Sequence, residues 1–178
     1  MLRRKEITPT GANIRRQYID IQKEGMNVSR REEALARFAG GLLCSQAILI
    51  TYGREAGMDE QTALRIARPF GSGLARTAEL CGAVTGAMMV LGLYEQGQEE
   101  KQAKEDVYRR VQEFSRRFRE RNGSLNCGEL LGCHLGTAEG QAHFHSEGLL
   151  KNCQKYVSDA AEILEELIPG RSEEVRIG

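Results

Sequence analysis

Four of the five cysteines in this sequence of 178 residues stand where the sequence predicts that a helix begins. They are Cys44, Cys81, Cys127 and Cys153. At the start of a helix, free backbone N–H groups carry a partial positive charge and can donate hydrogen bonds to a thiolate. This lowers the pKa of a cysteine from about 8.5, and the thiolate is the form that attacks electrophiles and binds metals. If folding gathers the four thiols, the pattern predicts a redox or metal-binding site.

Glycines and one arginine surround the second of these cysteines. The segment FGSGLARTAELCG places Gly71, Gly73 and Gly82 close to Cys81. Residues without a side chain let backbone amides approach a bound group closely. Arg76 lies in the same loop and is either a charge partner for an anion or cluster, or an ordinary loop arginine. These three glycines and Arg76 are therefore the candidate cofactor-binding residues.

No cysteine motif encodes a complete site locally. The sequence has no CxxC pair, which argues against a zinc ribbon or a thioredoxin-type site, and no CxxCH for covalent haem. Free cysteines often pack as small buried hydrophobic side chains, so a purely structural role is an alternative for all four. Any functional site must therefore be assembled by folding.

The fifth thiol and the histidines lie outside the helix-start pattern. Cys133 follows a predicted helix end, and we interpret it as a buried spectator, with a fifth ligand or a resolving thiol as alternatives. His143 and His145 are two residues apart and do not share a helix face. Together with His134, they are interpreted as surface histidines rather than metal ligands.

The elements that must position the thiols are all helical. Apolar residues recur at spacings of three and four, and alternation with a period of two is scarce, which predicts an all-α, compact multi-helix bundle. The expected helices run from Ser29 to Gly40–Gly41, over Leu42–Glu55, from Asp59 to Pro69, and over Leu80–Leu93, Glu99–Arg121, Leu125–Leu131 and Cys153–Ile168. The expected N-caps are Ser29 in a capping box with Glu32, Asp59, Ser124 and Asn152. The segment Gly132–Lys151, which holds all three histidines, is expected to be looser.

The length predicts one domain with a short extension. Residues 1–28 are the extension, with a short helix expected over Asn13–Lys23. Residues 29–170 form the single helical domain, and residues 171–178 are a C-terminal tail.

Composition narrows the partners. The 25 basic and 25 acidic residues balance, so bulk charge favours neither nucleic acid nor an anionic membrane. The most apolar run, Ala83–Leu93, is shorter than the roughly 20 residues of a membrane span, and the first residues lack a signal-peptide core. We expect a cytoplasmic protein, whose thiols are kept reduced. Its expected partners are an unknown electron-transfer protein and a second copy of the chain.

Four segments of the sequence resemble one known family. CSQAIL, FGSGLARTAELCGAVTGAMMVLGL, GSLNCGELLGC and CQKYVSDAAEILEEL are similar to the redox-active family called C_GCAxxG_C_C, over about Ala34–Leu167. The resemblance implies that the four cysteines are the family's cysteines, with the CGAxxG motif on Cys81, Gly82, Ala83 and Gly86. Relatives joined to haem domains, the split-Soret cytochromes, imply electron transfer and an iron–sulfur cluster. His134 stands where the resemblance leads us to expect an acidic residue.

Three functions follow from the residues and the resemblance. In the first, the four cysteines bind an iron–sulfur cluster or another metal for electron transfer. In the second, two of them cycle between dithiol and disulfide without a metal. In the third, the protein is a non-catalytic helical module with structural cysteines. The sequence contains no Ser–His–Asp set, phosphate-binding loop or paired catalytic carboxylates, so hydrolase and kinase functions have no support. Whether the protein is an enzyme stays open.

Overall fold

The computed structural model describes residues 28–95 and 99–168, and within these ranges the chain forms helices without any strand. The predicted all-α class is confirmed. The helices are α2 (Arg30–Ala39), α3 (Cys44–Gly53), α4 (Glu60–Ala67), the 3₁₀ turn η1 (Arg68–Phe70), α5 (Gly71–Arg76), α6 (Gly82–Leu93), α7 (Glu100–Asn122), α8 (Cys127–Leu131), α9 (Ala138–Ser146) and α10 (Leu150–Leu167). The helix expected over Asn13–Lys23 and the tail lie outside the described residues.

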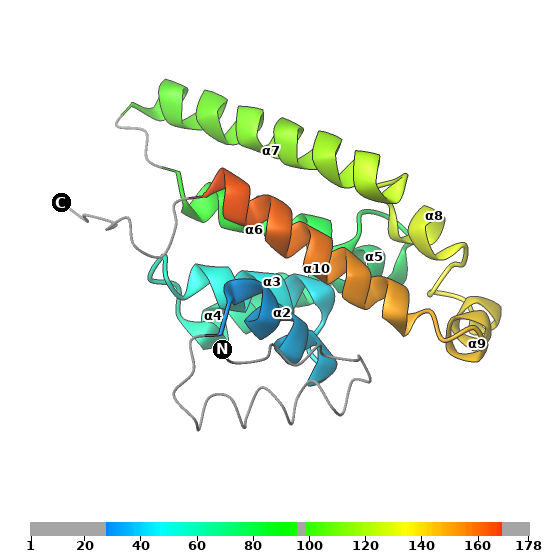
Figure 1. Cartoon of the computed structure of the whole chain (residues 1–178). Helices are drawn as coiled ribbons and strands as arrows, with labels where there is room; N and C mark the ends of the chain where they lie inside the picture. Colours follow the sequence, from blue (N-terminus) through cyan, green and yellow to red (C-terminus); the bar gives the residue numbers. More distant parts are fainter. Residues whose placement is uncertain (1–27, 96–98, 169–178) are drawn as a thin grey trace, which may run out of the picture.

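Helices α3 and α6 form the centre of the molecule. Both are apolar on every side, which is typical of a helix surrounded by other helices. They approach closely because Gly86 has no side chain: a Cβ there would lie 2.9 Å from the carbonyl oxygen of Ser45. Helices α2, α4 and α10 pack against α3, while α7 runs along α6 and α10 (Figure 1). The short helices α5, α8 and α9 gather at the end of the molecule where α10 begins.

Local signals explain where several helices begin and end. Ser29 and Glu32 form the predicted capping box, and the Asp59 side chain accepts a hydrogen bond from the Thr62 N–H at 2.8 Å. Helix α7 ends at Gly123, which has the left-handed backbone that glycine adopts without steric cost (φ 85°).

Two predicted caps and one predicted loop are wrong. Asn126, rather than Ser124, is the N-cap of α8, and the Ser124 hydroxyl accepts a hydrogen bond from the Asn126 N–H at 3.0 Å. Helix α10 begins at Leu150, just after the left-handed Gly148, so Asn152 lies inside the helix. The segment expected to be loose contains α9, whose first turn is capped by the side chain of Thr137.

Helix α5 is a left-handed helical turn where the sequence predicts a loop. Ser72, Gly73, Leu74 and Ala75 have φ values between 52° and 71°, and Arg76 continues the run at 71°. A left-handed backbone costs a non-glycine residue about 1–2 kcal/mol, so surrounding contacts must hold the turn. The Thr77 hydroxyl donates to the carbonyl of Leu74 at 2.9 Å and closes it.

The charged faces of α7 and α10 are tied together by ion pairs. Arg121 binds Glu162 at 3.0 Å, and Arg117 binds Glu166 on the same face. Of the helices in residues 28–95 and 99–168, none combines the length and apolarity that crossing a bilayer requires.

A four-cysteine cavity as the candidate functional site

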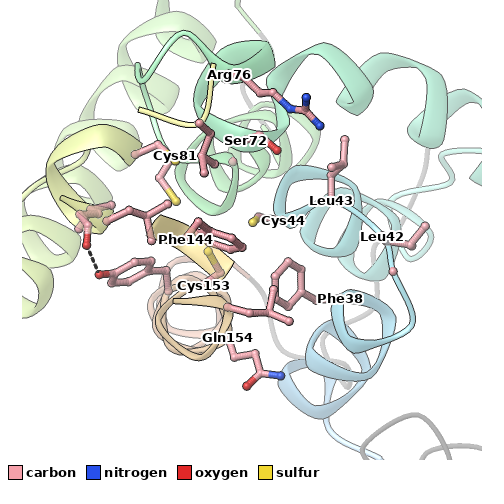
Figure 2. A pocket seen from close by; sticks show the side chains of 18 of the residues that line it. Phe38, Leu42, Leu43, Cys44, Ser72, Arg76, Cys81, Phe144, Cys153 and Gln154 are labelled. Atoms are coloured by element: carbon pink, nitrogen blue, oxygen red, sulfur yellow. Dashed lines mark hydrogen bonds between the residues drawn. The ribbon is translucent and has the colours of Figure 1, made fainter. Parts of the chain in front are cut away.

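Folding brings the four predicted cysteines to one cavity of about 350 Å³. Cys44, Cys81, Cys127 and Cys153 all line it, and they come from α3, the N-cap of α6, α8 and α10. Figure 2 labels Cys44, Cys81 and Cys153. Cys81 and Cys127 are buried, whereas Cys44 and Cys153 are half-buried. Exposed residues such as Arg76 and Leu150 also line the cavity, so it reaches the molecular surface.

Three of the thiols occupy the predicted helix-start position. Cys44 is the first residue of α3, Cys81 is the N-cap of α6, and Cys127 is the first residue of α8. Cys153 is the fourth residue of α10, just beyond the first turn. The backbone N–H groups of Ala83 and Val84 act to lower the pKa of Cys81, which is the direction of the helix-start effect expected from the sequence.

Backbone and side-chain hydrogen bonds fasten these helix starts to one another. The Cys81 N–H donates to the carbonyl of Leu125 at 2.8 Å, and the Cys127 N–H donates to the carbonyl of Glu79 at 2.7 Å. The Tyr156 hydroxyl donates to the carbonyl of Leu130 at 2.8 Å and so ties α10 to α8. The positions of the thiols are therefore set by contacts between helices and not by one local motif.

The glycines around Cys81 make room for the thiols and their supports. A Cβ on Gly73 would lie 2.6 Å from the Cβ of Cys127, and one on Gly82 would lie 3.1 Å from the Cβ of Cys44. Gly71 faces the side chain of Leu43, where a Cβ would lie 2.7 Å from its nearest atom. Gly82 also lines the cavity. The backbone approaches its surroundings closely at these glycines, as the sequence predicts, and the groups that it approaches are the side chains of Leu43, Cys44 and Cys127.

Cys44 and Cys153 lie next to each other in the cavity (Figure 2). A hydrogen bond from the Cys44 thiol is the largest cause that lowers the pKa of Cys153. The same interaction raises the pKa of Cys44 well above its ordinary value, and burial and the neighbouring thiols raise it further. Of the two thiols, Cys153 is therefore the one that ionises more readily.

The other two thiols are held in the protonated form. Burial raises the pKa of Cys81 to about 11, against the opposing effect of its two backbone hydrogen bonds. Burial, together with repulsion from Cys81 and Cys153, raises the pKa of Cys127 to about 12. The predicted lowering of the thiol pKa is thus wrong for Cys44, Cys81 and Cys127, because removal from water outweighs the field of the helix start. The pKa of Cys153 is lowered, but the largest cause is the hydrogen bond from Cys44 and not the start of the helix.

Arg76 lies at the edge of the cavity with its guanidinium exposed. Its side chain makes no hydrogen bond or ion pair with any other residue in the described part of the chain. This arrangement fits both predicted alternatives, an anion partner and an ordinary loop arginine.

The fifth cysteine and His134 lie outside the cavity lining. Cys133 is half-buried after α8, and burial, with a smaller effect of Cys153, raises its pKa. The ring of His134 accepts a hydrogen bond from the Gly136 N–H at 3.0 Å. A Cβ on Gly140 would lie only 2.0 Å from the carbonyl oxygen of His134, so this histidine belongs to a tight turn before α9.

Several lining residues were not predicted. Phe144 and His145 reach the cavity from α9, and Gln154 and Tyr156 reach it from α10. His143 and His145 are both exposed, as expected, but His145 also lines the cavity. The spacing of Gln154 and Tyr156 from Cys153 could have indicated them, whereas Phe144 depends on the unpredicted helix α9.

Among the described residues, the possible metal ligands of the cavity do not surround a common point. Within residues 28–95 and 99–168, no three His, Cys, Asp or Glu side chains are arranged to hold a metal ion. The lining of the cavity nevertheless includes four sulfur donors, and none of its described residues has a carboxylate.

Comparison with known proteins identifies one similarity. A family model described as "Putative redox-active protein (C_GCAxxG_C_C)" matches residues 42–167, well over half of the chain. No curated protein and no solved structure matches the chain.

Proposed function

Because this chain belongs to the C_GCAxxG_C_C family of redox-active proteins, we propose that its four-cysteine cavity is the redox centre and that Cys44 and Cys153 are a dithiol that cycles with a disulfide. The observation that carries this proposal is that both thiols line the same cavity and lie next to each other in it (Figure 2). Disulfide formation needs two sulfurs that can come into bonding distance without large backbone movement. For each of these two thiols, the other one is the largest cause of the shift in its pKa.

The chemistry of the pair follows from its geometry. The Cys153 thiolate attacks one sulfur of a disulfide substrate, the substrate's S–S bond breaks, and its first half leaves as a thiol after taking up a proton. Cys44 then gives up its proton and attacks the Cys153 sulfur, which releases the second half of the substrate. The substrate gains two electrons from the pair and two protons, one given up by Cys44 and one taken from the solvent, while the pair becomes a disulfide. An external dithiol reverses the reaction.

The two roles suit the environments of the two thiols. Cys153 is half-buried and lines the cavity, so a small molecule that enters can reach it. Cys44 donates to it and thereby favours the thiolate that starts the reaction. Once Cys153 is bonded to substrate, it no longer carries a charge, and Cys44 loses the acceptor that held its proton.

Oxidation of the reduced protein by a small neutral disulfide, followed by peptide mass spectrometry, tests this proposal. We expect two free thiols to be lost and a Cys44–Cys153 linked peptide to appear. Cys133→Ala is the matched control, since it removes a thiol that does not line the cavity, and it should still give the linkage. Five free thiols after oxidation, or a linkage between other cysteines, would contradict the proposal.

An iron–sulfur cluster is the second candidate. It is favoured by one observation: four thiols line the same cavity, together with no carboxylate from the described residues, and such clusters are held by thiolates. Cys44, Cys81, Cys127 and Cys153 would hold it, and it would supply one-electron transfer. The number and type of donors fit, but the described residues present no three of them arranged around an ion, so no reaction step is built on a cluster.

Anaerobic purification with iron and sulfide analysis separates the two candidates. Stoichiometric iron and sulfide, lost in Cys81→Ser and retained in Cys133→Ser, would favour the cluster. Colourless protein without iron, even after reconstitution, would contradict it. If the protein neither binds iron nor forms the disulfide, both candidates fail and the structural role of the cysteines stands.

A further inference from the structure

The lining of the cavity has a marked division between apolar and polar residues. The aromatic side chains of Phe38 and Phe144 lie near the Cys44–Cys153 pair (Figure 2), and Leu42 is a further apolar residue of the lining. Polar side chains are contributed by Ser72, Arg76, Gln141, His145 and Gln154. Within the described part of the chain, no aspartate or glutamate is among the lining residues. A ligand with an apolar body and a polar, anionic end matches this division.

Arg76 is the cation that such a ligand would meet. Several other arginines of the described chain bind carboxylates: Arg37 and Arg54 bind Glu33, and Arg121 binds Glu162. Among the described residues, Arg76 has no carboxylate partner, and it differs from the other unpaired arginines because it lines the cavity. Its guanidinium has five N–H donors, arranged to bind a carboxylate through two parallel hydrogen bonds.

The backbone at Arg76 is held in an unfavourable conformation. Its φ of 71° continues the left-handed turn of α5. Its carbonyl oxygen is covered by Gly136, where a Cβ would lie 2.6 Å away. Strained backbone of this kind persists when surrounding contacts hold it, and it occurs most often at functional sites. Here it places the arginine beside the thiols.

The size of the cavity limits the ligand. About 350 Å³ lies near the lower end of the range for small-molecule sites, roughly 300–1,000 Å³. Cys153 lines this space from the second turn of α10. A small molecule can therefore reach the sulfur directly.

Resting on the thiol–disulfide function proposed above, we infer that the substrate is a small disulfide that carries a carboxylate and an apolar group. The carboxylate pairs with Arg76, the apolar group lies against Phe38 and Phe144, and the disulfide bond is presented to Cys153. The substrate is reduced to two thiols while Cys44 and Cys153 become a disulfide. A dithiol reductant regenerates the pair.

The experiment compares two aromatic disulfides that differ in charge. Dithiobis-nitrobenzoate carries two carboxylates, and dithiodipyridine is uncharged near neutral pH. The rate of formation of the Cys44–Cys153 disulfide is measured by stopped-flow absorbance and confirmed by peptide mapping. The variant is Arg76→Asn, because asparagine tolerates the left-handed backbone better than most residues do. Arg76→Lys keeps the charge, and Arg68→Gln removes an exposed arginine that does not line the cavity.

We expect Arg76→Asn to slow the reaction with the dianion by about fivefold, the effect of an ion pair at an accessible site. The reaction with dithiodipyridine should be unchanged, and Arg68→Gln should match the wild type with both reagents. Raising the ionic strength should reduce the advantage of the dianion. Arg76→Lys should retain most of that advantage.

Two negative outcomes are distinguishable. If the Cys44–Cys153 disulfide forms with both reagents, but Arg76→Asn slows them equally or not at all, the substrate class is wrong and the dithiol function stands. If neither reagent produces that disulfide, the proposed function itself fails. Far-UV circular dichroism on each variant separates these results from loss of the helical fold.

Discussion

Removing the thiol of Cys44 should raise the pKa of Cys153. The Cys44 thiol donates the hydrogen bond that lowers this pKa. Cys44→Ala removes the donor, whereas Cys44→Ser replaces it with a hydroxyl at the same position in α3. The pair of variants therefore separates loss of the hydrogen bond from loss of the sulfur atom.

The size of the effect follows from the strength of the bond. A hydrogen bond to a charged group contributes about 1.5–3 kcal/mol, and a thiol is a weak donor, so the lower end applies. Since 1.36 kcal/mol corresponds to one pKa unit, Cys44→Ala should raise the pKa of Cys153 by about one unit. Each unit reduces the thiolate fraction about tenfold at neutral pH, but the more basic thiolate is intrinsically more nucleophilic. With a Brønsted coefficient of about 0.4–0.5, the net rate at neutral pH falls about three- to fourfold.

The assay follows the reaction of Cys153 alone across a range of pH. The reduced protein is exposed briefly to dithiodipyridine and quenched with acid, and modification of the peptide that carries Cys153 is quantified by mass spectrometry. We expect the Cys44→Ala profile to lie below that of the wild type at neutral pH. Above both pKa values it should lie about threefold higher, because the more basic thiolate then reacts faster. Cys44→Ser should lie between the two.

The crossing of the two profiles is the decisive feature. A variant that merely exposes Cys153 would react faster at every pH, and one that disturbs α10 would react differently without a shifted midpoint. If Cys44→Ala leaves the midpoint of the Cys153 titration unchanged, the hydrogen bond does not set its pKa. The reasoning that makes Cys153 the attacking thiol would then be refuted.

Three further predictions concern stability, each measured by urea unfolding. Gly86→Ala should destabilise the protein by about 1–3 kcal/mol, because its Cβ would lie 2.9 Å from the Ser45 carbonyl oxygen. Gly92→Ala on the same helix meets nothing within 4 Å and should stabilise the protein by about 0.5–1 kcal/mol. Equal effects of the two substitutions would refute the close packing of α3 on α6. The free energy of unfolding should fall as the pH rises from about 9 toward 12, because Cys127 keeps its proton in the folded protein (pKa about 12) and loses it near pH 8.5 in the unfolded chain. The fall should be smaller in Cys127→Ala. An identical dependence on pH in that variant would argue against a buried neutral thiol at Cys127. Glu33→Gln should lower the free energy of unfolding by about 1–3 kcal/mol, because Glu33 is 2% exposed and its carboxylate binds two arginines that solvent can partly reach. A decrease below about 0.5 kcal/mol, the size of a typical surface substitution, would contradict the role given to this buried carboxylate.

Much of the helical framework is predictable because its signals are local. The capping box of Ser29 and Glu32 and the cap at Asp59 set helix starts through neighbours three residues away. The long helix predicted over Glu99–Arg121 is observed as Glu100–Asn122. Apolar periodicity and capping depend on residues a few positions apart, so these helices can be predicted from the sequence alone.

The errors occur where distant contacts decide the backbone. The left-handed turn of α5 has one glycine among the residues Ser72–Arg76 with positive φ, so no local signal announces it. The start of α10 lies before Asn152, although asparagine is a favoured cap, and α9 lies in a segment without clear periodicity. Tertiary packing overrides local preference at these three places.

The candidate site divides in the same way. The placement of Cys44, Cys81 and Cys127 at helix starts is a local property, and the sequence alone determines it. The choice of Cys153 as the partner of Cys44, from 109 residues away, depends on how α3 packs near the start of α10. The direction of each pKa also depends on packing, because it is set by how many atoms replace water around the sulfur. The sequence thus determined which thiols stand at helix starts, and only the tertiary structure decided which one becomes the thiolate, because burial and contact between distant segments exist only once the chain has folded.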